Sequence, residues 1–231
     1  MRRTTPKAAI YTVATTHLDT SWNWELETTL KDYLPKTLTE NFALFEKHPG
    51  YVFSFEGACR YELMEEYYPE LFEKLREYIA AGTWNVAGIA YENGDVNIPS
   101  PEALIRNILY GQAYFREKFG KTSADVYLPD CFGFGWALPS AAAHCGLKGF
   151  TTQKLVWSSA AGVPFDLGIW RGPDGAEIFA SLDARDYNAT LRKVRTNGRI
   201  VRKLKANIRQ YGLPMTMVLH GVGDRGGAPC S

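Results

Sequence analysis

The chain lacks long hydrophobic runs and has few cysteines. None of its apolar stretches approaches the roughly 18 residues that a membrane-spanning helix needs, so we expect no membrane partner. The cysteines are scattered without a C-x-x-C pair, which argues against a disulfide framework and favours a reducing compartment; they are Cys59, Cys131, Cys145 and Cys230. The first residues lack a secretory signal pattern, and we therefore expect a cytoplasmic location unless a leader has been removed.

An excess of charge of one sign is also missing. The chain has 26 Lys and Arg against 25 Asp and Glu, which gives no reason to expect nucleic acid as a partner. One segment departs from this balance, because eight Lys and Arg and no acidic residue lie between residues 187 and 223. We interpret this segment as a basic helix over residues 190–211 with a solvated face, or a face that contacts a further domain.

Strand-like and helix-like segments alternate along the chain. Apolar, β-branched strands are predicted at residues 8–16, 51–55, 84–92, 125–129, 149–153 and 215–222, with a hairpin at 167–171 and 177–183. Helices are predicted at residues 26–47 with a break or kink at Pro35, at 60–81, from Ser100 onward and at 136–145. Strands separated by helix-length segments form βαβ units, so we expect an α/β fold with mainly parallel strands.

Three of the predicted strands end in clusters of acidic residues or histidine. The first cluster contains His17 and Asp19, the second contains Asp130, and the third contains Asp224. In parallel α/β sheets, ligands and catalytic groups gather at the carboxyl ends of the strands. We therefore expect the three clusters to face one common mouth.

The first cluster has the spacing of a metal site. His17 and Asp19 are two residues apart, so on extended backbone they point to the same side and can reach one cation. With Asp130 as a third ligand, a His/Asp/Asp set suits zinc and leaves a position for water or substrate. An isolated pair of this kind is more often a hydrogen-bonded histidine beside a helix N-cap, but the carboxylates at the other strand ends favour the metal.

Carboxylates beside aromatic side chains indicate carbohydrate chemistry. Asp130 and Asp224 are the pair of acids that a glycosidase needs, one to attack and one to protonate the leaving oxygen. Trp22 offers a flat face for a sugar ring, although core packing explains it equally well. The glycine-rich segment around Asp224 also fits G-x-G-x-x-G, but Gly227 and Pro229 argue against the helix that a dinucleotide site requires.

These segments together resemble glycoside hydrolase family 38, the α-mannosidases. The resemblance rests on THLDTSW (16–22), residues 84–120, LPDCFGFGWALPSAAAHCGLKGFTTQK (128–154), residues 169–188 and GVGDRGG (221–227). It spans nearly the whole chain in the same order. It implies a seven-stranded β/α barrel-like catalytic domain over residues 1–231, one zinc ion, and retaining hydrolysis of terminal α-mannosides.

The resemblance also implies roles for individual residues. The zinc ligands would be His17, Asp19 and Asp130, with Asp130 also acting as the nucleophile and Asp224 as the general acid/base. Three further positions correspond to substrate-binding residues of the family: Trp22, Lys154 and Tyr187. The match of the last two rests on spacing alone.

One expected element has no match in this chain. The family's fourth zinc ligand is a histidine downstream of the acid/base motif, and the position of His220 gives no reason to substitute it. We therefore expect the N-terminal part of a longer enzyme, without its C-terminal domains and with little or no activity alone. Two alternatives are a zinc-dependent polysaccharide deacetylase, with Asp130 as a base, and a non-catalytic carbohydrate-binding module.

Overall fold

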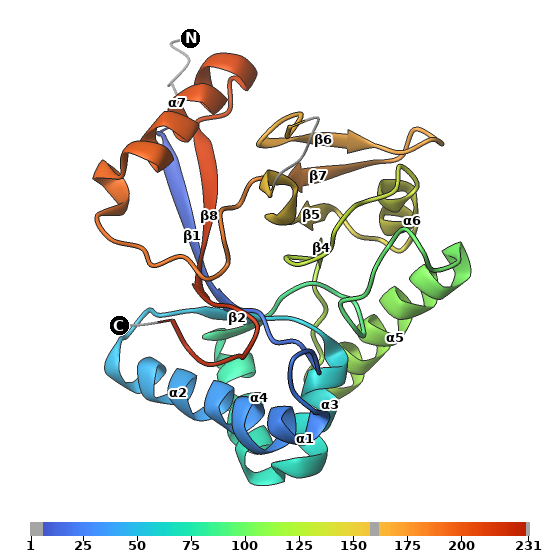
Figure 1. Ribbon diagram of the computed structural model, residues 1–231, viewed down its shortest axis with the longest axis vertical. Helices are drawn as coiled ribbons and strands as arrows, with labels where there is room; N and C mark the ends of the chain where they lie inside the picture. The colour runs from blue at the N-terminus through green and yellow to red at the C-terminus, as the bar shows by residue number, and fades with distance from the viewer. Residues whose placement is uncertain (1–6, 158–161, 230–231) are drawn as a thin grey trace.

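The computed structural model describes residues 7–157 and 162–229, which form two four-stranded sheets and the helices around them (Figure 1). The strand orders are β3-β2-β1-β8 and β4-β5-β7-β6. The strands are β1 (Ala9–Thr16), β2 (Phe53–Phe55), β3 (Trp84–Val86), β4 (Asp125–Tyr127), β5 (Gly149–Thr151), β6 (Leu167–Arg171), β7 (Glu177–Ser181) and β8 (Met215–Val222). All neighbours are parallel except the β6–β7 hairpin, which confirms the predicted α/β fold with mainly parallel strands.

The predicted seven-stranded barrel is not confirmed, because no strand ladder joins the two sheets within the described residues. On one side, the Gly88 N–H donates to the Asp125 carboxylate at 3.3 Å. On the other side, the Leu219 N–H donates to the Ala184 carbonyl oxygen at 2.7 Å. Single hydrogen bonds of this kind hold the two sheets together without closing them into a continuous barrel.

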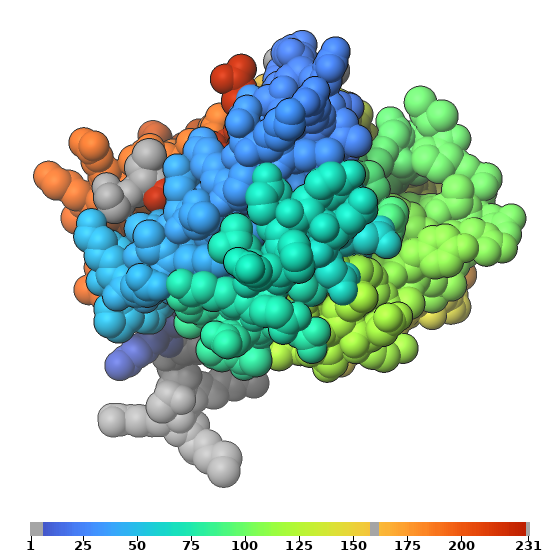
Figure 2. Space-filling model, turned by 90° about the horizontal axis from the view of Figure 1, so that it is seen from below, coloured from blue at the N-terminus to red at the C-terminus, as the bar shows by residue number. Residues whose placement is uncertain are grey.

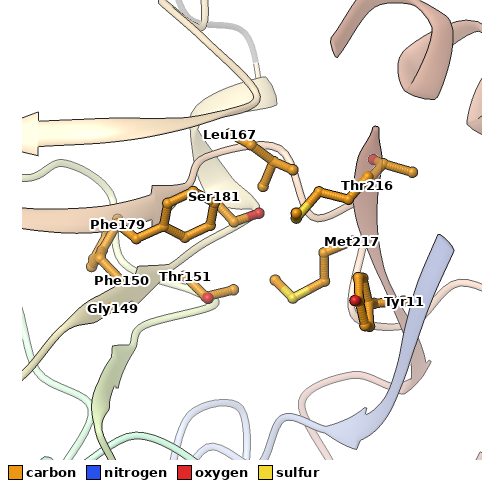
Figure 3. A pocket seen from close by; sticks show the side chains of 10 residues that line it. Tyr11, Gly149, Phe150, Thr151, Leu167, Phe179, Ser181, Thr216 and Met217 are labelled. Atoms are coloured by element: carbon orange, nitrogen blue, oxygen red, sulfur yellow. The ribbon is translucent and has the colours of Figure 1, made fainter. Parts of the chain in front are cut away.

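An apolar cleft lies between the two sheets (Figure 3). Tyr11 and Met217 line it from the first halves of β1 and β8, while Thr151 and Phe179 line it from β5 and β7. This cleft marks where the two sheets separate.

Helices cover the outer face of the first sheet and one side of the second (Figure 1). The α-helices are α1 (Leu26–Thr28), α2 (Leu34–Lys47), α3 (Ala58–Tyr67), α4 (Pro69–Ala81), α5 (Pro101–Phe119), α6 (Leu138–His144) and α7 (Gly198–Tyr211). The helices α2 to α5 lie together on one face of the molecule (Figure 2). The shorter elements are the π-helical η1 (Thr29–Tyr33) and the 3-10 helices η2 (Lys154–Val156) and η3 (Val194–Thr196). Tyr61, Trp84 and Phe115 anchor an aromatic core between α2–α5 and the first sheet, so much of the chain's aromatic content is core packing.

Prolines change two of the predicted helices. Residues 26–47 form one helical run, and the irregularity at Pro35 takes the form of the π-helical turn η1 just before it. The predicted helix over 60–81 is two helices, because the residue before a proline disfavours the α conformation and Tyr68 precedes Pro69 with an extended φ of −138°. By contrast, Ser100 caps α5 as predicted, accepting a hydrogen bond from the Ala103 N–H.

Several predicted elements are shorter than expected, two of them by more than five residues. The strand over 84–92 ends at Val86, and the chain then continues irregularly toward the mouth of the fold. The basic helix begins at Gly198 instead of residue 190, because the side chain of Asn197 caps its first N–H groups. In the described parts of the chain, no helix combines the length and the hydrophobicity needed to cross a membrane. Cys59, Cys131 and Cys145 are free thiols, and Cys230 lies outside the described residues.

Candidate active site

The carboxyl ends of β1, β4 and β8 bring the three predicted clusters together. Nε2 of His17 lies 3.4 Å from Oδ1 of Asp19 and 3.7 Å from Oδ2 of Asp130. One possible ligand atom from each of these residues lies within 4.8 Å of the other two. The three side chains line the same polar cleft, as expected for strand ends that share one edge.

Backbone contacts tie the loop after β8 to the loop after β1. The Asp19 N–H donates to the Asp224 carbonyl oxygen at 2.9 Å, and the Gly226 N–H donates to the His17 carbonyl oxygen at 3.2 Å. This contact places Asp224 beside the metal-type cluster although more than 200 residues separate them in the sequence.

The glycines before Asp224 are explained by close packing. A Cβ on Gly221 would lie 1.6 Å from the Thr15 carbonyl oxygen, and one on Gly223 would lie 2.6 Å from the Tyr187 ring. Asp224 itself adopts a left-handed backbone with φ of 64°, which is uncommon for a residue with a side chain. The glycines of the G-x-G-D pattern therefore allow this loop to pack closely against β1 and Tyr187. No helix starts within residues 221–224.

His17 is buried and its ring is held by Glu56. Its Nδ1 lies 2.9 Å from Oε1 of the buried Glu56, while Nε2 faces Asp19 and Asp130 and has no hydrogen-bond partner within the described residues. Burial lowers the pKa of His17, but the nearby carboxylates of Asp19 and Glu56 outweigh this effect and raise it to about 9.

The cluster fits a divalent zinc ion on the chemistry of its donors. A buried imidazole nitrogen without a partner faces two carboxylates, and nitrogen and oxygen donors of this kind are common zinc ligands. His17, Asp19 and Asp130 are the residues that could hold such an ion. His220 lies elsewhere on β8, lining a different pocket, and does not join this group.

Asp130 contacts a cation and a hydroxyl group. Its Oδ1 forms an ion pair with the buried ammonium of Lys154, and its Oδ2 accepts a hydrogen bond from the Tyr187 hydroxyl at 3.2 Å. The Lys154 ammonium also lies over the ring of Trp157, 3.8 Å from its centre, and 4.7 Å from the ring centre of Phe132. Lys154 thus contacts the carboxylate and is not free at the surface.

The Tyr187 hydroxyl lies between the two acids. It is 3.2 Å from Oδ2 of Asp130 and 3.0 Å from Oδ1 of Asp224. These two carboxylate oxygens are therefore no farther apart than the sum of those distances. Burial and the charges of Asp130 and Asp224 raise the pKa of Tyr187, so its hydroxyl keeps its proton at neutral pH.

The structure does not bring Trp22 into the cleft. Its side chain is 64% exposed and contacts the edge of Trp24, outside the residues that line the polar cleft. Two exposed aromatic residues, Phe132 and Trp157, instead lie around Lys154, the ion-pair partner of Asp130. Sequence reasoning missed these two, although each lies within three residues of a predicted site residue.

A largely buried polar layer at the cleft was also missed. Glu56 contacts His17, and Arg60 forms an ion pair with Glu92 at 2.9 Å and donates from Nε to the Leu18 carbonyl oxygen at 2.7 Å. Gly57 leaves room for this arginine, because a Cβ there would lie 2.0 Å from its Nη1. Glu56 follows β2 directly, so the strand-end pattern that identified the other acids could have identified it too.

Comparison with known proteins agrees with this geometry. The chain matches the family described as "Glycosyl hydrolases family 38 N-terminal domain" over residues 7–231. It is 32% identical over 220 residues to alpha-mannosidase G of Dictyostelium discoideum, covering 95% of this chain and 20% of that protein. It is also 32% identical over 214 residues to human alpha-mannosidase 2C1, covering 92% of this chain and 20% of that protein.

A solved structure shares the fold. The crystal structure of an alpha-mannosidase from Enterococcus faecalis V583 matches with a TM-score of 0.72 at 20% identity, covering 96% of this chain and 26% of that one. The chain spans about one fifth of the length of the curated relatives it matches. Its sequence and fold show that the chain belongs to glycoside hydrolase family 38, where it corresponds to the N-terminal domain.

Proposed function

We propose that this domain is the N-terminal catalytic domain of a zinc-dependent retaining α-mannosidase that hydrolyses terminal α-mannosides. The observation that carries this proposal is the Tyr187 hydroxyl, which lies within hydrogen-bond distance of both Asp130 and Asp224 beside the His17 cluster. Further domains of a longer enzyme would complete the site. The free thiols of the described cysteines fit a cytoplasmic location.

The proposed metal ligands are His17, Asp19 and Asp130. When bound, a zinc ion would offset the negative charge of the carboxylates and hold hydroxyl groups of the sugar. The chain's own part is to fix the donors: backbone hydrogen bonds link the loops that carry Asp19 and Asp224, and Glu56 holds the His17 ring.

Asp130 is the proposed nucleophile. Its carboxylate attacks the anomeric carbon, so that a carbon–oxygen bond to the enzyme forms as the bond to the leaving oxygen breaks. The ion pair with Lys154 and the hydrogen bond from Tyr187 hold the carboxylate in position for this step. Retaining glycosidases place their two carboxyl groups roughly 5–5.5 Å apart, and the shared contact with Tyr187 is compatible with that spacing.

Asp224 is the proposed general acid/base. Tyr187 has a single hydroxyl proton, so it cannot fully satisfy two ionised carboxylates at once. With a proton on Asp224, the Asp224 O–H donates a hydrogen bond to the Tyr187 hydroxyl, and the Tyr187 O–H donates one to Asp130. Asp224 would give its proton to the leaving oxygen and then take one from the water that releases the sugar from Asp130.

The proposed sugar contacts are Trp22, Lys154 and Tyr187. Tyr187 and Lys154 border the nucleophile directly, whereas Trp22 would have to meet the substrate from its exposed position on the loop after β1. Phe132 is 81% exposed next to Asp130 and provides a second apolar face at the mouth. The basic helix α7 remains a surface for contact with a further domain.

The test measures zinc content and mannoside hydrolysis of the full-length protein. We expect one zinc per chain, loss of aryl α-mannoside hydrolysis on chelation, recovery with zinc, and α-mannose as the first product seen by NMR. His17→Ala should lose both zinc and activity, while the exposed His48→Ala should keep both. First release of β-mannose, release of acetate from acetylated polysaccharide, or mannoside binding without turnover would each contradict the proposal.

A further inference from the structure

Glu56 is an acid that the proposed chemistry does not use. It directly follows β2 and its side chain is completely buried, with 0% exposure. Its Oε1 contacts Nδ1 of His17, and its Oε2 has no hydrogen-bond partner within the described residues. A buried carboxylate with one unpaired oxygen costs stability, so its one hydrogen bond is the feature that needs an explanation.

The contact determines which nitrogen of His17 is free. An ionised carboxylate only accepts hydrogen bonds, so the 2.9 Å contact requires the proton of a neutral His17 to be on Nδ1. The lone pair is then on Nε2, the atom that lies 3.4 Å from Asp19 and 3.7 Å from Asp130. Glu56 therefore selects the tautomer whose free nitrogen faces the cluster.

The surroundings of Glu56 support a rigid arrangement. Gly57 has a left-handed φ of 82° immediately after it, and begins the turn into α3, from which Arg60 returns beneath the site. The Arg60 side chain is also buried and connects Glu92 to the Leu18 carbonyl oxygen, next to His17. The segment from Glu56 to Arg60 thus fixes the histidine ring and the backbone that follows it.

We propose that Glu56 is a positioning residue for the metal site, which holds His17 as the Nδ1–H tautomer and aims its Nε2 at the cation. This inference rests on the proposed zinc site. Partners of this kind orient metal-binding histidines and raise their basicity, and their loss typically costs 10–100-fold in metal affinity.

The experiment compares zinc affinity and histidine tautomers in three forms of the full enzyme. Wild type, Glu56→Gln and Glu56→Leu are titrated with zinc against a competing chelator, and nitrogen-15 NMR reports the tautomer of zinc-loaded His17. A His17→Asn spectrum assigns the His17 signal. Glu65→Gln is the control, because it removes a carboxylate that binds Lys118 and not a histidine.

We expect wild-type His17 to be protonated on Nδ1 and bound through Nε2. Glu56→Leu should lose about 10–100-fold in zinc affinity, and Glu56→Gln should lose less, because its amide oxygen still accepts the same hydrogen bond. Glu65→Gln should bind zinc as wild type does. Circular dichroism of each metal-free form shows whether it folds. If Glu56→Leu does not fold, the tautomer of wild-type His17 and the zinc affinity of Glu56→Gln still test the inference.

Three results overturn the inference. They are a proton on Nε2 of zinc-loaded His17, zinc affinity of a folded Glu56→Leu within twofold of wild type, and a Glu56→Gln form weaker than folded Glu56→Leu. Failure of the proposed function gives a different result, because the wild-type enzyme would then bind no zinc. Without a zinc site, Glu56 would have no positioning role.

Discussion

The Tyr187 hydroxyl lies 3.0 Å from Oδ1 of Asp224, a residue that holds a left-handed backbone with φ of 64°. Gly223 permits this contact, since any side chain there would collide with the Tyr187 ring. A residue in an uncommon backbone conformation is retained where the surrounding structure fixes it, and such positions cluster at functional sites. This contact supports the proposed role of Asp224 as the acid/base.

Removal of Asp224 should separate substrates by their leaving groups. In the full enzyme, Asp224→Ala should slow natural and alkyl mannosides by about 10²–10⁴-fold, the usual contribution of a general acid. Mannosides with activated aryl leaving groups need no proton, so their glycosylation rate should change little. Steady-state and pre-steady-state rates over a series of leaving groups check this, and a uniform loss across the series would remove Asp224 from its role.

Removal of the Lys154 charge should weaken catalysis without removing the metal. Lys154→Met keeps most of the side-chain volume but leaves the Asp130 carboxylate without its ion pair. We expect kcat to fall by roughly 10²–10³-fold, as for other lost electrostatic contacts at reacting centres. Zinc content and aryl mannoside turnover are measured together, with the exposed Lys148→Met as the control. Activity above half of wild type would show that the ion pair is not needed.

The pKa of His17 predicts how the metal-free chain responds to pH. That pKa is about 9 in the fold against 6.5 ordinarily, because the carboxylates of Asp19 and Glu56 beside the ring outweigh the effect of burial. The folded form thus holds the proton more tightly than the unfolded form. The protonated histidine therefore stabilises the fold fully below about pH 6.5, and this stabilisation is lost as pH rises through 9. Its size is of the order of 3 kcal/mol.

Urea unfolding with a chelator present measures this effect. Between pH 6 and pH 9.5, wild type should lose about 3 kcal/mol more of its free energy of unfolding than His17→Asn, which has no titrating group at that position. The same proton competes with the cation, so zinc affinity should rise over this range. Parallel pH profiles of wild type and His17→Asn would contradict the assignment.

Lys203 should be important for the attachment of the two sheets. It extends from α7, which packs on β8, to Asp166 at 2.8 Å and Asp183 at 3.6 Å, which flank the β6–β7 hairpin. All three side chains are largely buried, and removal of one partner from such a group costs about 3–5 kcal/mol. Lys203→Met should lower the free energy of unfolding by about 3 kcal/mol, while the exposed Lys205→Met should change it by less than about 0.5 kcal/mol.

The site was more predictable from the sequence than the sheet. His17, Asp19, Asp130 and Asp224 each follow a strand, and parallel strands deliver their carboxyl ends to one edge whatever their order. Closure of a barrel instead depends on pairing between segments far apart in sequence. Here β3 ends at Val86, and the Gly88 N–H reaches the Asp125 side chain without a strand ladder, which no local pattern in the sequence encodes.

The buried layer was less predictable for a related reason. Glu92 falls inside a stretch that looks like a continuing strand, WNVAGIAYE, yet the chain leaves the sheet after Val86 and carries this residue to Arg60. Arg60 itself looks like an exposed helical residue, since neither its neighbours nor its spacing mark it as buried. Its burial follows from Gly57, whose missing side chain makes space for the guanidinium.

Identification of the residue that carries the covalent sugar tests the central claim most directly. The full enzyme, loaded with zinc, is treated with a 5-fluoro mannosyl fluoride, which forms the glycosyl-enzyme but leaves it slowly. The peptides are then mapped by mass spectrometry. The account predicts one added 5-fluoro-mannosyl group on Asp130, absent in Asp130→Ala and formed at a much reduced rate without zinc. A label on any other residue would contradict the assignment of Asp130 as the nucleophile.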